Sequence, residues 1–327
     1  MNRENAGKLL QIFGLILGIA LSASAARADF YVIPVPQKAS AANLYKKTVV
    51  VSPGNTDTES GTALLTAIDA ITDASSTNRY LILIEPGVYD IGTETFAMKS
   101  YVDVQGSGEN VTKITGSVSN IPPAAKVGVV EGADNAELRF VTVENTGTST
   151  SVVAILNSGA SPTLTFVTAS ATGGYYRYGV SNNDSAAVLR NVTVAIDHPA
   201  SSGLAIGVEN EGGSDIVMEG VTIGLTGNVS KVGVDLSGST TTTLMRNVSV
   251  TVSTGGFATV ALQNDGSTVY VEHSILSGPN WIWNSSMTYV ANSRIEGGVR
   301  FNSHTIKCAG VYDGAFNFYA SSCPSPS

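Results

Sequence analysis

Short stretches in which apolar and polar residues alternate recur along most of the chain. One kind ends in asparagine, as in "VAILN" (153–157) and "IGVEN" (206–210), and a second kind has the form of "LRNVTV" (189–194). Alternation with period two, many Val, Thr and Ile residues, and Gly, Asn, Asp or Ser between the stretches are typical of β-strands. The pattern therefore predicts an all-β protein built from short strands.

The second kind of stretch marks a regular repeat. Its valine, in a "VT" or "VS" pair, recurs every 25 to 29 residues, at Val141, Val167, Val192, Val221 and Val248. A leucine-rich repeat would need a fixed leucine pattern, and a propeller blade would need about 40 residues or more. We therefore predict a right-handed parallel β-helix, a solenoid whose coils stack at the strand spacing of about 4.8 Å.

A solenoid needs covers at its two ends. Residues 58–75 carry apolar residues at helical spacing and predict an N-terminal capping helix. Residues 304–327 are aromatic-rich and contain Cys308 and Cys323, which we expect to form a disulfide that closes a C-terminal cap. We assign residues 48–327 to one β-helix domain, preceded by a lead-in at residues 29–47.

The first 28 residues have the pattern of a secretory signal. Arg3 and Lys8 precede an apolar run from Leu9 to Leu21, and small residues ending in "ARA" follow. The run is short of the roughly 20 residues that a membrane span needs. We therefore expect export to the periplasm, the cell surface or the medium, with cleavage after residue 28 and no membrane span in the mature chain.

The net charge of the chain and the spacing of its possible metal ligands bear on whether it binds nucleic acid or a metal ion. The formal net charge is −8, and without clustered Lys and Arg such a chain is not expected to bind nucleic acid. The three histidines have no metal-ligand spacing, so we predict no metal site and no cofactor. Glu209 and Asp235 occupy outward positions on consecutive coils, either as a calcium pair or as solvating surface acids.

Asparagines end most of the first kind of stretch. Stacked at one turn, their amides would bond the coils above and below, whereas the alternative is a sugar-binding row. We favour the structural role for this set, which consists of Asn157, Asn182, Asn210, Asn264, Asn284 and Asn302.

Residues 48 to about 303 resemble the pectin methylesterase branch of the pectin-lyase-like β-helix superfamily. "YVDVQGSGENVTKITG" (101–116) is similar to the family's opening. "ATVALQNDGSTVYVEHSILSG" (258–278) is similar to its Q-A-V-A-L coil, and "SRIEGGVRFNS" (293–303) to the coil that follows. The resemblance implies the same fold and a function connected with polysaccharides.

The residues that perform the chemistry of those esterases do not carry over. The resemblance places Ala258 where the family has an oxyanion-holding glutamine and Arg300 where it has the nucleophilic aspartate. The element of the acid aspartate offers only Asn280 and Trp281. Because an arginine stays protonated and has no electron pair to offer, it cannot act as that nucleophile. We therefore predict no catalytic residues.

Both tryptophans of the chain, Trp281 and Trp283, lie in this region. Strict alternation would place them on the same face of a strand, so that both enter the core or both stand outside. On the outside they would form a platform for sugar rings, with Arg300 and Asn302 one coil away as polar partners. We take these four residues as the candidate ligand-binding set.

The sequence thus predicts an exported, catalytically inactive pectinesterase-like binding or surface module for a polysaccharide or a cell-surface glycan. Its negative charge makes acidic pectin a poor ligand. Two alternatives stay open. One is a carbohydrate-active enzyme, a pectinesterase or polysaccharide lyase with its catalytic residues elsewhere, and the other is a purely structural or adhesin rod.

Overall fold

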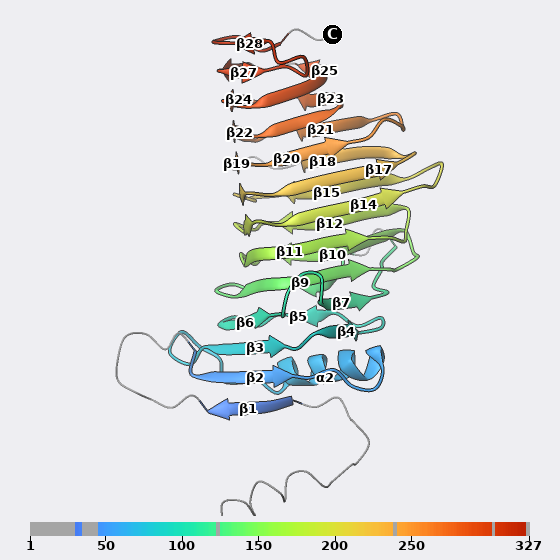
Figure 1. Cartoon of the computed structure of the whole chain (residues 1–327), viewed down its shortest axis with the longest axis vertical. Helices are drawn as coiled ribbons and strands as arrows, with labels where there is room; N and C mark the ends of the chain where they lie inside the picture. Colours follow the sequence, from blue (N-terminus) through green and yellow to red (C-terminus); the bar gives the residue numbers. More distant parts are fainter. Residues whose placement is uncertain (1–29, 35–44, 122–124, 238–240, 303–304, 325–327) are drawn as a thin grey trace, which may run out of the picture.

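The computed structural model describes residues 30–34, 45–121, 125–237, 241–302 and 305–324. These residues form a rod of stacked coils, with α2 at the N-terminal end and β28 at the other (Figure 1). Almost all pairings between strands are parallel and join one coil to the next. The predicted parallel β-helix is therefore confirmed.

The strands form three parallel sheets that run the length of the rod. Sheet 1 contains β5 (Phe96–Ala97), β8 (Gly128–Glu131), β10 (Ser151–Ser158), β12 (Tyr176–Asn183), β15 (Leu204–Glu211), β18 (Ser230–Leu236), β21 (Thr259–Asn264) and the C-terminal parts of β23 (Ile275–Asn284) and β25 (Arg294–Asn302). This sheet carries the candidate site described below.

Sheet 2 contains β2 (Lys47–Val51), β3 (Tyr80–Ile84), β6 (Val102–Gln105), the first parts of β9 (Glu137–Asn145) and β11 (Thr163–Ala171), β13 (Val188–Arg190), β16 (Val217–Glu219), β19 (Thr242–Arg246), β22 (Thr268–Glu272), β24 (Thr288–Ala291) and β26 (Ile306–Ala309). Sheet 3 contains the second parts of β9 and β11, the first parts of β23 and β25, and β4 (Gly87–Asp90), β7 (Thr112–Gly116), β14 (Thr193–His198), β17 (Thr222–Gly227), β20 (Ser249–Val252) and β27 (Val311–Tyr312).

The corner between sheets 2 and 3 explains the second kind of repeat. From β9 to β25, each coil turns there through one residue with positive φ, a conformation that asparagine and glycine adopt more readily than most residues. In successive coils this residue is Phe140, Phe166, Asn191, Gly220, Asn247, His273 and Asn292. The valine that marks the period follows the corner and is buried.

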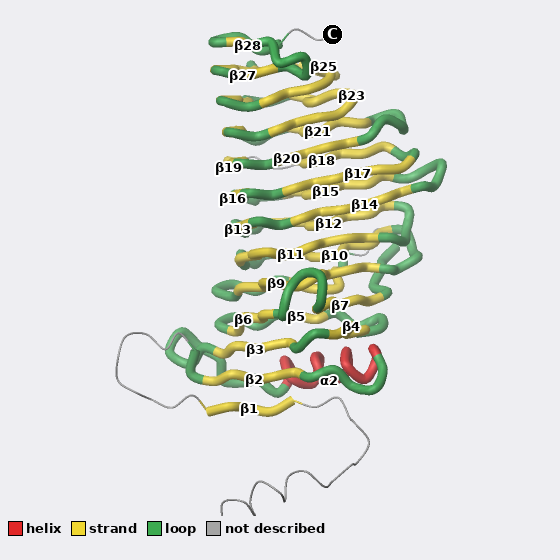
Figure 2. The backbone as a smooth tube through the Cα atoms, viewed as in Figure 1, coloured by secondary structure: helices red, strands yellow, loops and turns green. Residues whose placement is uncertain are grey.

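The N-terminal end of the rod is covered by α2 (Asp57–Asp69) and by β1 (Phe30–Pro34), which pairs antiparallel with β2 (Figure 2). The Thr56 hydroxyl accepts a hydrogen bond from the Glu59 amide at 3.1 Å and caps the helix. A Cβ on Gly61 would lie 1.9 Å from the Asp90 carbonyl oxygen, so the helix can pack this closely only with glycine there. The predicted capping helix is confirmed, although it begins at residue 57 and ends at 69.

The C-terminal end is closed as expected. Cys308 in β26 forms a disulfide with Cys323, with 5.0 Å between the two Cα atoms. β28 (Phe318–Tyr319) turns back and pairs antiparallel with β27, which ends the parallel stack.

The asparagines of sheet 1 point into the rod and bond one another. The Asn157 amide donates to Asn182 Oδ1 and the Asn182 amide to Asn210 Oδ1, both at 2.8 Å. All three residues are fully buried. The structural role predicted for them is confirmed, and Asn264 donates to Asn284 in the same way at 3.3 Å.

Sheet 1 departs from strict alternation at the same place in its successive strands. In β10, Ala154 and Ile155 both belong to the central core, whereas Val153 and Leu156 on either side of them belong to a second apolar cluster. The interstrand register skips Ala154 and the equivalent small residues Gly179, Gly207, Gly233 and Ala261. These residues must be small, because a Cβ on Gly179 would lie 2.3 Å from Val194.

In the part of the chain that the structure describes, no helix has the length and hydropathy needed to cross a membrane. The signal sequence predicted at residues 1–28, like residues 35–44 of the lead-in, lies outside the described residues.

Candidate functional site on the outer face of sheet 1

The two tryptophans lie on opposite faces of β23. Trp281 is 1% exposed and packs in the central core, whereas Trp283 is half-buried and packs against the second apolar cluster on the outer face. The prediction that they share a face is wrong. The skipped position of sheet 1 recurs in β23, so Trp281 and Ile282 both enter the core, as Ala261 and Leu262 do one coil earlier.

This placement divides the predicted ligand-binding set. Trp281 is a core residue and lies away from the outer surface, while Trp283 is half-buried on that surface. The backbones of Arg300 and Asn302 belong to β25, where Asn302 lies opposite Asn284 and Phe301 opposite Trp283. The side chains of Arg300 and Asn302 lie outside the described residues, so their role stays a prediction.

Trp283 is the last described side chain of a row that runs along the outer face of sheet 1. Each coil contributes one residue to this row, which we call the polar row, and its members are Leu156, Ser181, Glu209, Asp235, Gln263 and Trp283. Because neighbouring coils are one strand spacing apart, the row presents a new side chain about every 4.8 Å. The outward positions predicted for Glu209 and Asp235 on consecutive coils are confirmed.

Glu209 is an unusual residue for an outer face because it is only 4% exposed. Its Oε2 accepts a hydrogen bond from the Ser181 hydroxyl at 2.5 Å and forms an ion pair with Lys126. Burial raises the pKa of the Glu209 carboxyl above its ordinary value, while Lys126 and Ser181 act in the opposite direction. Keeping the Glu209 carboxyl at this buried position therefore costs desolvation free energy.

Asp235, on the next coil, is 6% exposed. It accepts a hydrogen bond from the Ser237 amide at 3.0 Å, and no cation pairs with it among the described residues. Burial raises the pKa of this carboxyl, and the hydrogen bonds from Ser237 only partly oppose the shift. A buried carboxylate without a counter-ion is destabilising, which is typical of residues kept for function.

We expect the Asp235→Asn variant to be more stable than the wild type at neutral pH, by about 1 kcal/mol. Because the folded-state pKa is raised, protonation of the aspartate favours folding. This contribution is fully present below the ordinary pKa of 3.8 and is lost as the pH rises through the folded-state pKa. Asparagine does not ionise, so the gain should appear at pH 7 and vanish below that ordinary pKa. Urea unfolding at several pH values measures it.

Glu94→Gln is the charge-matched control, since Glu94 is exposed. It should leave stability nearly unchanged across the same pH range. An Asp235→Asn variant that is less stable than wild type at pH 7 would show that the carboxylate contributes favourably to the fold.

Lys126 reaches the polar row from the segment between β7 and β8. Besides Glu209, its ammonium pairs with Glu211 at 3.1 Å and lies 4.7 Å from the centroid of the Tyr178 ring. A cleft of about 240 Å³ lies beside it, lined by Ala125, Lys126, Leu156, Ser158, Ser181, Asn183 and Glu211. The outer face of sheet 1 therefore combines a cleft, carboxylates and aromatic rings.

Some of these residues were not predicted as site residues. Lys126 lies outside the repeats and 83 residues from Glu209 in sequence, so no periodic signal connects the two. Gln263, in contrast, occupies the position of Asp235 one repeat later, and aligning the repeats would have placed it in the row.

The metal alternative receives no geometric support from the described part of the chain, where no group of three or more His, Cys, Asp or Glu side chains is arranged to hold an ion. Glu209 is instead paired with Lys126.

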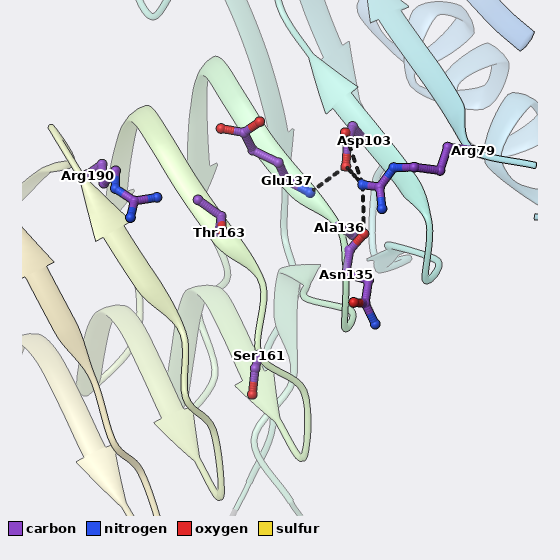
Figure 3. Close-up of a pocket in the computed structure, with 8 residues that line it drawn as sticks. All are labelled: Arg79, Asp103, Asn135, Ala136, Glu137, Ser161, Thr163 and Arg190. Atoms are coloured by element: carbon purple, nitrogen blue, oxygen red, sulfur yellow. Dashed lines mark hydrogen bonds and ion pairs between the residues drawn. The ribbon is translucent and has the colours of Figure 1, made fainter. Parts of the chain in front are cut away.

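A second cavity, of about 330 Å³, lies at the N-terminal end of sheet 2 (Figure 3). Arg79 donates to Asp103 at 3.2 Å and to the Asn135 carbonyl at 3.0 Å. Asp103 also accepts from the Glu137 amide at 2.9 Å and from the Tyr45 hydroxyl at 2.7 Å. These groups are bonded to one another and join neighbouring coils, which makes this cavity the weaker candidate.

No protein-family model matches the chain, and no curated protein matches it significantly. Among solved structures, pectin methylesterase PemA from Erwinia chrysanthemi is similar with a TM-score of 0.45 and 12% identity, over 87% of this chain and 93% of that one. A pectin methylesterase from carrot gives 0.44 and 14%, over 74% and 82%.

The A-module of mannuronan C-5 epimerase AlgE6 from Azotobacter vinelandii gives a TM-score of 0.43 and 16% identity, over 80% of this chain and 79% of that one. At such identities the likeness concerns the fold alone. The fold itself follows from the three stacked sheets described above, and it is the parallel β-helix that the sequence predicted.

Proposed function

We propose that this protein is an exported, non-catalytic module that binds a polysaccharide along the outer face of sheet 1. The observation that carries the proposal is the polar row, in which Glu209, Asp235, Gln263 and Trp283 stand in register on consecutive coils. Carboxylates accept hydrogen bonds from sugar hydroxyls, and side-chain amides both accept hydrogen bonds from them and donate hydrogen bonds to them. An indole ring packs against the apolar face of a sugar.

The chemistry of the residues supports binding without turnover. The positions that resemble those of the esterase catalytic groups hold Ala258, Asn280 and Arg300, none of which supplies a carboxylate. Export is supported by the signal-like residues 1–28 and by the disulfide, which suits an oxidising compartment.

Trp283→Ala should weaken polysaccharide binding by about tenfold, because the variant loses the only indole of the described outer face while the core keeps its packing. A glycan array identifies the ligand, and isothermal titration calorimetry compares the variants. Tyr270→Ala is the control. It removes a half-exposed aromatic ring from sheet 2, where Tyr270 stacks on Tyr289, and should leave binding unchanged.

Equal binding by wild type and Trp283→Ala would contradict this assignment of the binding face. An array without any bound glycan would favour the structural or adhesin rod instead.

One observation favours a second candidate, a carbohydrate-active enzyme. Glu209 and Asp235 are both buried, and burial raises the pKa of both carboxyls, as is common for catalytic acids. Release of methanol or of unsaturated products from pectins, abolished by Asp235→Asn, would establish this activity. Turnover abolished by Arg300→Ala would instead place the chemistry at the esterase-like position.

A further inference from the structure

Resting on the proposed function, we propose that the polysaccharide bound by the polar row carries free amino groups, and that the Lys126 ammonium occupies the subsite of one of them. The ligand would be a chain of amino sugars, such as glucosamine units, that lies along the rod. Lys126 would then act as a tethered competitor which the ligand displaces.

The surroundings of Lys126 show what this subsite recognises. Its ammonium lies between the carboxylates of Glu209 and Glu211 and over the ring of Tyr178, 4.7 Å from the centroid. Two carboxylates satisfy the hydrogens of a primary ammonium, and an aromatic face adds a cation–π attraction. The same three groups would bind the protonated amine of a sugar.

Asp235 is the independent observation that points to a ligand. Its carboxyl is 6% exposed and accepts a hydrogen bond from the Ser237 amide, and among the described residues no cation pairs with it. It follows Glu209 by one coil on the same face. A neutral sugar would leave this buried negative charge uncompensated, whereas a second ammonium group would compensate it.

The geometry of the row and the charge of the chain agree with such a ligand. A sugar unit of an extended chain is about as long as the coil spacing, so an oligosaccharide along the rod places about one unit over each coil. The net charge of −8 attracts a polycation and repels polyuronates. Among polysaccharides, a polymer of amino sugars fits both features.

The test compares a hexamer of glucosamine with a hexamer of N-acetylglucosamine by isothermal titration calorimetry, at a mildly acidic pH where the free amine is protonated. We expect the wild type to bind the glucosamine hexamer at least about tenfold more tightly. Lys126→Gln should bind it about fivefold more tightly than wild type, because the competitor is gone. Glu209→Gln should bind it at least about tenfold less tightly.

Two further variants separate this effect from net charge and from damage to the fold. Lys113→Gln makes the same charge change at a surface lysine that pairs with Glu144 at 2.9 Å, away from the row, and should leave the affinity unchanged. Lys126→Arg keeps the positive charge and should bind like wild type. Thermal unfolding shows that each variant is folded at the temperature of the titration.

The possible outcomes distinguish this inference from the proposed function. If the wild type bound the two hexamers with equal affinity, and Trp283→Ala bound both more weakly, the amino-sugar inference would be overturned and polysaccharide binding would still stand. A Lys126→Gln variant no tighter than Lys113→Gln would overturn the displacement of Lys126. Binding of hexalysine as tightly as of the glucosamine hexamer would overturn selectivity for a sugar. Failure to bind any polysaccharide would overturn both proposals.

Discussion

Trp281→Ala is expected to lower the free energy of unfolding by about 4 kcal/mol, which is among the largest effects of any single substitution in this protein. Trp281 is 1% exposed and is the largest fully buried side chain of the described residues. Its removal leaves a cavity between the last coils, and the surrounding strands can close it only in part because the interstrand hydrogen bonds hold them in place. Urea unfolding followed by circular dichroism measures the loss.

Trp283→Ala is the matched comparison, since it removes the same side chain two residues later. It should cost about 1 kcal/mol, because Trp283 is only half-buried on the outer face. Trp281→Ala should still bind polysaccharide like the wild type wherever it is folded, whereas Trp283→Ala should bind it about tenfold more weakly. If the Trp281→Ala variant were as stable as the wild type but did not bind polysaccharide, the Trp281 indole would have to face outward.

The fold could be predicted because a solenoid repeats its physical requirements in every coil. In five successive coils a buried valine follows the corner between sheets 2 and 3, and an asparagine recurs in most of the central coils of sheet 1. Each coil buries the same positions, so the period of 25 to 29 residues is visible in the sequence. The two caps were also predictable, from helical spacing at one end and from the two cysteines at the other.

The orientation of the tryptophans could not be derived from alternation alone. In sheet 1, two successive residues enter the core at one place in successive strands, which reverses the faces of all residues that follow. The signal for this was present, because a small residue recurs there, at Ala154, Gly179, Gly207, Gly233 and Ala261. A recurring glycine or alanine inside an apolar strand thus marks a break in alternation.

The position of Lys126 could not be predicted for a different reason. It belongs to the segment between β7 and β8, which is longer than the corresponding segments of the other repeats, and it meets Glu209 across a separation of 83 residues. Contacts of this kind depend on tertiary structure and leave no periodic trace. Glu209, which it binds, and Asp235 occupy the same position in successive repeats, and for that reason the sequence placed both on one face.

The asparagine ladder, the row of buried and mutually bonded asparagines Asn157, Asn182 and Asn210 in sheet 1, leads to the second large expected loss of stability. Asn182 is the middle member, since it accepts from Asn157 and donates to Asn210 Oδ1, both at 2.8 Å, and to the Glu209 carbonyl at 3.2 Å. Leucine has a similar shape but forms none of these bonds. Asn182→Leu therefore leaves the Asn157 amide and the Asn210 oxygen buried without their partners, and should lower the free energy of unfolding by about 3 kcal/mol.

Asn183→Ala is the control for this prediction, because Asn183 is the next residue along β12 and lies on the outer face. It should change the free energy of unfolding by less than about 0.5 kcal/mol. Urea unfolding of the two variants, side by side, tests whether the ladder or the strand as a whole stabilises this coil. If Asn182→Leu were as stable as wild type, the recurrence of asparagine would need another cause than amide bonding. The sugar-binding role would remain excluded for Asn157, Asn182, Asn210, Asn264 and Asn284, because their side chains are fully buried.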